Sequence, residues 1–232
     1  MEFVKRENEI VHTLKSLAEE KLDFVVVGDY AVSGLGKHRF SADCDVVVPK
    51  KEKGRTEAVL KKNEFEKDFE KRGFDDTYAG EFVRFKKKAG ELPVTFDVLV
   101  GSLVCRTTGG SWSFEYIRKY SVQTTIAGIE TVVDCSVPEK ELMIAFKIHS
   151  ARRTDVRDII MMMEKVDLDK VLTHLRRGEV ETLRNQINNI FEMLNDEKLV
   201  DSLKGVFTLT IDVRKQIENI RKNIETILKG LK

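Results

Sequence analysis

The sequence predicts an α+β protein, with a mixed sheet flanked by helices over residues 1–135 and a helical bundle over residues 136–232. Short apolar, β-branched runs bounded by glycine or proline recur up to Cys135 and indicate buried strands. After Ser136, apolar residues recur mainly at helical spacing. A chain of 232 residues is also long enough to bury a core in one large domain or in two modest ones.

The elements predicted for the first domain are mostly short. Ile10, Leu14 and Leu17 share one helix face near the N-terminus. The β-branched run Val46–Val48 is typical of a buried strand, and a charged segment ahead of Gly73 indicates a surface helix. In chain order we expect a helix over 2–20, strands at 24–27 and 46–48, a helix at about 57–71, a hairpin of 82–86 with 94–100, and strands at 114–117, 121–126 and 131–133.

The second domain is predicted to begin at a capping box. Ser136 would be the N-cap and Glu139 the N3 residue, with Pro138 in the first turn, and this helix would run to about Ala151. Two apolar stripes at helical spacing then predict packed helices, the first at Leu183, Ile187, Ile190 and Leu194, the second at Ile217, Ile220, Ile224, Ile227 and Leu231.

Composition narrows the classes of protein that fit. The three cysteines lie far apart and are odd in number, which indicates neither a disulfide framework nor a zinc site and favours a reducing, cytoplasmic setting. No run approaches the roughly 20 apolar residues that span a bilayer, so we expect a soluble protein without a membrane partner. The net charge of +1 means that any nucleic-acid contact must come from local basic patches.

Three acidic residues interrupt apolar strands. Asp43 and Asp45 open the Val46–Val48 run, and alternate strand residues project to the same side. Asp97 lies in the middle of the apolar strand 94–100. If the two strands are neighbours, the three carboxylates converge, and hard oxygen ligands of this kind suit Mg²⁺ and phosphoryl transfer. For any one of these acids taken alone, a strand-end residue paired with a lysine is the favoured interpretation.

A glycine turn adds to this pattern. Gly28 follows the first predicted strand, and glycine allows the backbone to approach a phosphate while the next helix offers N–H groups to an anion. Arg39, just ahead of the acid pair, could clamp a phosphate or form a surface ion pair. Lys147 stands among apolar residues, where a triphosphate contact is favoured over a lysine that extends from the core to solvent.

Gly28-Asp29, a spacer, Asp43-Cys44-Asp45 and the later Asp97 resemble the polymerase-beta-type nucleotidyltransferase signature. The stretches 27–32 and 36–45 are similar to minimal nucleotidyltransferases of the AbiEii-type toxin group, and the resemblance continues with Lys147, Arg152 or Arg153, Asp155 and Asp158. Together these motifs span about residues 24–160.

The resemblance implies a nucleotidyltransferase fold with Asp43, Asp45 and Asp97 as metal-binding catalytic residues. It also implies that nucleotide is bound around Gly28, Asp29 and Ser41, together with Arg39 and Lys147, and that Asp155 and Asp158 support Lys147 or an arginine. The family has Gly or Ser at the position of Asp29, and we expect Asp29 to act as an N-cap pointing away from the phosphates.

The leading hypothesis is a Mg²⁺-dependent enzyme that transfers a nucleoside monophosphate from an NTP to a hydroxyl. The resemblance favours a tRNA end or a protein side chain as acceptor, a toxin role and a cognate antitoxin as partner; an aminoglycoside-type acceptor is the alternative within this chemistry. The hypothesis from another class is a nucleotidyltransferase fold that serves as a binding module without turnover.

Overall fold

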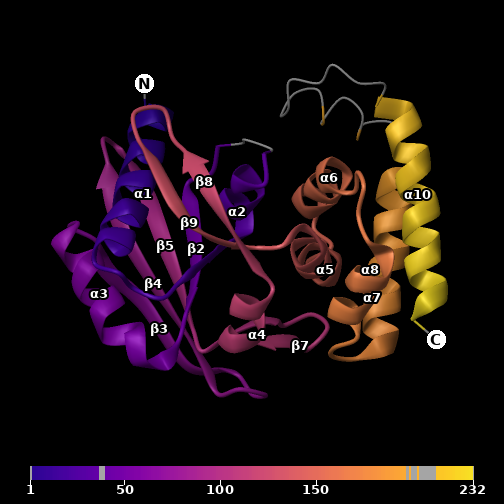
Figure 1. The fold of residues 1–232 in the computed structure, drawn as a ribbon, viewed down its shortest axis with the longest axis horizontal. Helices are drawn as coiled ribbons and strands as arrows, with labels where there is room; N and C mark the ends of the chain where they lie inside the picture. Colours follow the sequence, from indigo (N-terminus) through magenta and orange to yellow (C-terminus); the bar gives the residue numbers. More distant parts are fainter. Residues whose placement is uncertain (1, 37–39, 197–198, 200–202, 204–212, 232) are drawn as a thin grey trace. The chain divides into compact units, whose positions relative to one another are not determined.

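The computed structural model describes residues 2–36, 40–196, 199, 203 and 213–231 (Figure 1). The chain forms two compact units. The first contains Met1–Val104 and Ser111–Pro138, and the second contains Cys105–Gly110 and Glu139–Lys232. A short loop inside the first unit's sequence therefore belongs to the second unit.

The first unit is built on a five-stranded sheet. Its described strands, with those of two smaller two-stranded sheets, are β1 (Val25–Val27), β2 (Asp43–Val48), β3 (Glu66–Asp75), β4 (Gly80–Ala89), β5 (Leu92–Val100), β6 (Ser102–Cys105), β7 (Gly110–Ser113), β8 (Ser121–Ala127) and β9 (Val132–Pro138). The main sheet has the order β1-β2-β5-β4-β3, and β6 pairs with β7 and β8 with β9. Only β2 and β5 run parallel among the neighbours of the main sheet, so this sheet is mixed, as predicted.

Helices cover one face of the main sheet. Helix α1 (Glu2–Glu19) contacts β5, β4 and β9, and α2 (Gly28–Gly34) contacts β2 and β8 (Figure 1). A 3₁₀ turn, η1 (Lys50–Glu52), leads into α3 (Lys53–Lys62), and α4 (Phe114–Lys119) follows β7. On the α1 side of the sheet Phe85 and Phe96 are fully buried, and Phe65 packs edge-on against Phe96 with ring centroids 5.2 Å apart. This apolar face is the core of the first unit.

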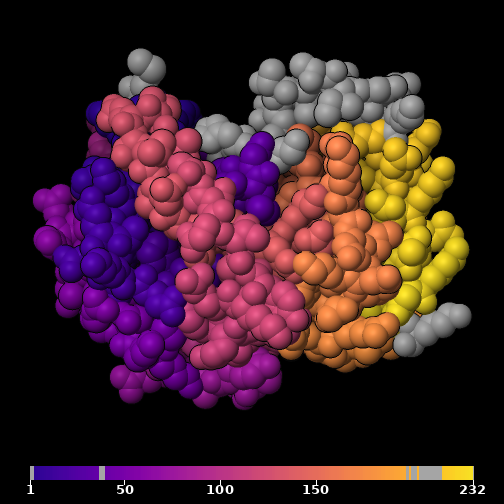
Figure 2. Space-filling view, in the orientation of Figure 1, coloured from indigo at the N-terminus to yellow at the C-terminus, as the bar shows by residue number. Residues whose placement is uncertain are grey.

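The second unit is helical, as predicted. Its helices are α5 (Lys140–Ser150), α6 (Arg153–Met162), α7 (Leu168–Leu175), α8 (Val180–Leu194) and α10 (Val213–Gly230). Both predicted apolar stripes are buried, and α10 packs against α8 and α7, seen as a continuous yellow and orange surface in Figure 2. The mixed sheet with its helices and the helical C-terminal part confirm the predicted α+β class.

The predicted helix over 57–71 is wrong in its second half. Helix α3 starts earlier, at Lys53, and ends at Lys62, and Glu64 then takes a left-handed backbone conformation with φ 63°. The following residues form β3, which pairs only with β4 in the sheet. Eight of its ten positions are exposed, and an edge strand tolerates the charged sequence that resembled a surface helix.

Two other boundaries differ from the prediction. Residues 114–117, expected as a strand, lie in α4, because the Ser113 hydroxyl accepts the Tyr116 N–H and caps a helix there. The expected capping box at Ser136 is absent because β9 extends through Pro138. Helix α5 starts at Lys140 with Glu139 at its N-cap.

The loop of residues 105–110 is held in the second unit by a fully buried histidine. His149 Nδ1 lies 2.6 Å from the Thr108 hydroxyl, and Nε2 lies 3.1 Å from the Leu175 carbonyl. The carbonyl can only accept, so Nε2 carries the proton and Nδ1 accepts from Thr108. Burial lowers the pKa of His149 from 6.5 to about 4, and the Arg177 charge acts in the same direction, while the Leu175 bond opposes them.

We predict that the protein loses stability as pH falls from about 6.5 to about 4. In this range the unfolded chain binds a proton at His149 while the folded chain does not, so the unfolding free energy falls by up to about 3 kcal/mol. Denaturant unfolding at several pH values measures this slope. His149→Gln should reduce the slope and the exposed control His12→Gln should not; equal slopes in both variants would contradict the assignment.

Candidate active site

The three predicted metal-binding acids lie on the two parallel strands at the centre of the sheet. Asp43 pairs in register with Thr95, and Asp45 pairs with Asp97. Neighbouring strands lie about 4.8 Å apart, and directly paired residues of parallel strands project to the same face. Cys44 and Phe96 alternate with these residues and are buried on the other face. The acids therefore share the face opposite the apolar core.

Each of the three carboxylates has a different environment. Asp43 is exposed, and its Oδ1 accepts the Thr95 hydroxyl at 2.7 Å. Asp45 is half-buried. Asp97 is only 6% exposed, and Asp45 and Asp97 lie side by side in the register. Like charges this close repel each other unless a cation lies nearby, so the arrangement calls for positive charge on this face.

Arg84 provides one such positive charge. It pairs in register with Asp97 across β4 and β5, where its Nε donates to Oδ1 at 2.8 Å and its Nη2 to Oδ2 at 2.7 Å. Both carboxylate oxygens thus accept hydrogen bonds from the two parallel N–H groups of one planar guanidinium, the Arg84 fork. The hydrogen bonds to Asp97 raise the pKa of Arg84, and the charges of Asp97, Asp43 and Asp45 add to the effect against partial desolvation.

Gly28 lies against the acid pair. It directly follows β1, whose Val27 pairs with Asp45. Its φ is +67°, a left-handed conformation that glycine adopts without a Cβ penalty. A Cβ at this position would stand 2.3 Å from Asp45 Oδ2. The glycine therefore allows both the turn into α2 and the close approach of the backbone to the Asp45 carboxylate.

Of the other residues predicted to bind nucleotide in the first unit, the structure describes Ser41 and Asp29 but not Arg39. Ser41 lies beside the acids, and its hydroxyl accepts the Asp43 N–H at 3.3 Å. Asp29 lies in the first turn of α2, whose N-cap is Val27, so the predicted N-cap role of Asp29 is wrong: the helix starts two residues earlier than that role requires. Arg39 lies outside the described residues.

Lys147 is buried in the second unit between two aspartates. Its Nζ lies 3.0 Å from Asp155 Oδ1 and 2.8 Å from Asp158 Oδ2, which confirms that both support this lysine. Arg152 Nε also donates to Asp155, at 2.8 Å. Burial acts to raise the pKa of Asp155, but Lys147 and Arg152 outweigh it, and the net pKa is lowered. These pairs favour a structural role for Lys147; its predicted triphosphate contact stays a prediction.

The acid face fits a divalent cation in donor type. Asp43, Asp45 and Asp97 offer hard oxygen ligands, which Mg²⁺ prefers. Their three negative charges exceed the single positive charge of Arg84. In the part of the chain that the structure describes, however, no three acidic, histidine or cysteine side chains are grouped closely enough to hold a metal ion. In the structure both oxygens of Asp97 accept hydrogen bonds from Arg84.

Cys44 is no candidate nucleophile although it stands between two of the acids. Its side chain is fully buried in the core. Burial raises the pKa of its thiol, and the negative charges of Asp45, Asp97 and Asp43 act in the same direction. A thiol that stays protonated on the far face of the sheet cannot attack a substrate at the acids.

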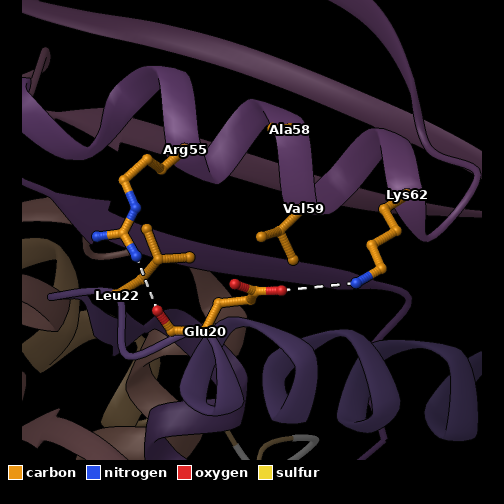
Figure 3. Close-up of a pocket in the computed structure, with 6 residues that line it drawn as sticks. All are labelled: Glu20, Leu22, Arg55, Ala58, Val59 and Lys62. Carbon is orange, nitrogen blue, oxygen red and sulfur yellow. Dashed lines mark hydrogen bonds and ion pairs between the residues drawn. The ribbon is translucent and has the colours of Figure 1, made fainter.

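A surface pocket of about 190 Å³ lies elsewhere in the first unit, between α3 and the segment that follows α1 (Figure 3). Arg55 donates to the backbone carbonyl of Glu20 at 2.8 Å, and Lys62 pairs with the Glu20 side chain at 3.5 Å. The pocket contains none of the predicted site residues; its lining is Glu20, Leu22, Arg55, Ala58, Val59 and Lys62.

Sequence reasoning missed Arg84 and Thr95. A signal for Arg84 existed, since residues equally far from a two-residue hairpin turn pair with each other. The turn lies at Gly90-Glu91 between Ala89 and Leu92, whereas the sequence suggested a longer loop. Placing the turn there puts Arg84 opposite Asp97. Thr95 could have been found as the residue two positions before Asp97 on the same strand face.

We predict that Gly28→Ala disrupts the acid site beyond the strain of its backbone. A left-handed alanine costs about 1–2 kcal/mol, and the new Cβ must also displace the Asp45 carboxylate. Gly73→Ala is the matched control, because Gly73 has φ +59° and nothing within 4 Å of an added Cβ. Thermal unfolding should show a larger loss for Gly28→Ala. Equal losses would mean that the Asp45 contact is unimportant.

Lys147→Met should destabilise the fold by about 3–5 kcal/mol, because it leaves buried carboxylates without their cation. Lys170→Met is the control. Lys170 pairs with Glu139 on the surface, where its side chain is 46% exposed, and such pairs contribute at most about 1 kcal/mol. Chemical denaturation measures both. Unchanged stability together with weakened NTP binding would favour the phosphate role instead.

Comparison with solved structures shows the fold. JHP933 from Helicobacter pylori matches with a TM-score of 0.52 and 16% identity, over 97% of this chain and 91% of that one. A candidate nucleotidyltransferase from H. pylori matches with a TM-score of 0.52 and 16% identity, over 99% and 96%. The lincosamide adenylyltransferase LnuA, bound to lincomycin, matches with a TM-score of 0.47 and 17% identity, over 68% of this chain and 97% of that one.

No protein-family model matches the chain, and no curated protein matches its sequence. Among the described residues, no helix is long and apolar enough to cross a membrane. At 16% identity the structural likeness concerns the fold alone. The chain has a nucleotidyltransferase fold, followed by C-terminal helices.

Proposed function

We propose that the chain is a Mg²⁺-dependent nucleotidyltransferase that transfers a nucleoside monophosphate from an NTP to an acceptor hydroxyl. The observation that carries the proposal is the register of β2 and β5, which puts Asp45 beside Asp97 with Asp43 on the same face. Gly28 borders the same carboxylates through its contact with Asp45. A fold of this class with acids and a glycine turn at one place supports phosphoryl transfer.

The chemistry follows from the positions of these residues. Asp43 and Asp45 would hold Mg²⁺, which neutralises charge on the triphosphate as the bond to pyrophosphate breaks. Asp97, once free of the Arg84 fork, would accept the proton of the acceptor hydroxyl. The hydroxyl oxygen then forms the new bond to the α-phosphorus, and pyrophosphate leaves. Gly28 and the start of α2 provide the backbone approach to the phosphates.

The proposal also concerns the acceptor of the nucleoside monophosphate. The resemblance of residues 24–160 to the AbiEii-type toxin group favours a tRNA 3′ end or a protein side chain, with a cognate antitoxin as partner. Incubation of the protein with α-labelled NTPs, Mg²⁺ and either total RNA or lysate would separate the two acceptors, because the label then appears in an RNA band or in a protein band.

A binding module without turnover is the second candidate. The specific observation that favours it is the Arg84 fork, which holds both oxygens of the carboxylate that would act as base. Binding of an NTP without label transfer to any acceptor would favour this candidate.

We predict that Asp45→Asn abolishes nucleotide transfer and leaves the metal-free protein as stable as the wild type or slightly more so. Removal of one of three neighbouring charges relieves repulsion, whereas the loss of a metal ligand removes several kcal/mol of transition-state stabilisation. Thermal unfolding without metal and labelled transfer with Mg²⁺ measure the two effects.

Asp134→Asn is the matched control for this experiment. Asp134 accepts a threonine hydroxyl, from Thr125 at 2.5 Å, as the neighbouring site residue Asp43 does from Thr95, but it lies on the β8–β9 hairpin. Its variant should keep full transfer. Undiminished transfer by Asp45→Asn would remove Asp45 from the site, and a marked fall in its metal-free melting temperature would make it a structural ion-pair partner.

A further inference from the structure

The Arg84 fork and a metal ion need the same atoms. Arg84 donates to both oxygens of Asp97, at 2.8 and 2.7 Å, in an in-register pair across β4 and β5. A cation that bound the remaining lone pairs of this carboxylate would lie close to the guanidinium, and two positive charges at such a distance repel each other. Full ligation by Asp97 therefore requires the fork to leave at least one oxygen.

We infer that Arg84 is a positioning residue that competes with the divalent metal for Asp97 and releases it when the metal arrives together with the triphosphate. This inference rests on the proposed function, because it concerns the charge balance of the same acid site. In the free protein Arg84 offsets part of the repulsion among the three carboxylates. When a divalent ion takes over that task, the guanidinium becomes available to another anion.

The surroundings of Arg84 provide a place for the released fork. Its guanidinium carbon lies 5.6 Å from the centroid of the Phe82 ring, and Phe82 stacks on Phe74 with centroids 5.1 Å apart. Cation–π attraction to this ring does not depend on Asp97. The side chain of Arg84 is 43% exposed and the side chain of Asp97 is 9% exposed, so the guanidinium can turn toward solvent without burial of its charge.

The triphosphate supplies the anion for the released fork. Phosphate oxygens accept the two parallel N–H groups of arginine in the same geometry as a carboxylate does. Metal and nucleotide should therefore bind cooperatively: the metal displaces Arg84 from Asp97, and the phosphates accept it. A metal ion alone, without this second partner, must bind against the competition of Arg84.

The test is Mn²⁺ binding, measured by titration calorimetry on the full chain with and without a non-hydrolysable NTP analogue. We expect Arg84→Gln to bind Mn²⁺ about tenfold more tightly than the wild type in the absence of nucleotide, because the competitor is removed. The analogue should tighten Mn²⁺ binding in the wild type by a larger factor than in Arg84→Gln. Arg72→Gln is the matched control: it removes the same charge from β3, where the Arg72 side chain is 83% exposed.

Each outcome decides the inference. Equal or weaker Mn²⁺ binding by Arg84→Gln than by Arg72→Gln overturns it and leaves the proposed function intact, because Arg84 would then hold Asp97 ready for the metal. Absence of Mn²⁺ binding in all variants, with and without the analogue, overturns both. Should Arg84→Gln fail to fold, Arg84→Met removes both the charge and the fork, and its Mn²⁺ affinity must exceed that of the wild type.

Discussion

The parallel pairing of β2 with β5 is the constraint on which the site depends. It places two carboxylates at adjacent positions of a sheet whose opposite face is the core of the first unit. Because side chains alternate along a strand, a slip of one residue would bury Asp45 and expose Cys44. The buried residues on the far face, such as Phe96, therefore fix the register, and the register in turn fixes the separation of the acids.

This packing also explains why like charges can stay together. The core stabilises the two strands whatever their polar face carries, so the repulsion between Asp45 and Asp97 is tolerated and partly offset by Arg84. A site built in this way gathers three carboxylates on one face of the sheet before any substrate arrives. The electrostatic preference for a cation is thus a property of the folded sheet, and substrate binding does not have to create it.

The sequence contained a large part of the site but not all of it. The strand period puts Asp43 and Asp45 on one face, and glycine after a strand marks the turn. That β5 lies beside β2 could only be assumed, because these strands are far apart in the chain and parallel pairs carry no local turn signal. Arg84 could be predicted as the partner of Asp97 only if the two-residue turn of the hairpin was placed correctly. In the second unit, the burial of Lys147 between Asp155 and Asp158 needed the packing of α5 against α6.

The predicted secondary-structure elements are wrong where the local preference of the sequence and the tertiary context disagree. Helical patterns in the second unit were confirmed because buried stripes repeat over several turns. Residues 114–117 are strand-like in sequence, although the side chain of Ser113 caps a helix there. The segment of β3 resembles a surface helix because its sequence is charged with sparse apolar positions and precedes Gly73. The segment forms a strand because its backbone pairs with β4, and this pairing cannot be read from the sequence of β3 alone.

The charged edge strand β3 also limits how another polypeptide can approach the first unit. Its register with β4 shifts twice, between Lys67 and Phe69 and between Lys71 and Asp75. Irregular pairing and charged side chains are features by which natural sheets discourage the addition of a further strand. Backbone annealing at this edge, whether by a second copy or by an extended peptide, is therefore disfavoured. At this edge a macromolecular partner would have to be recognised through side chains and shape.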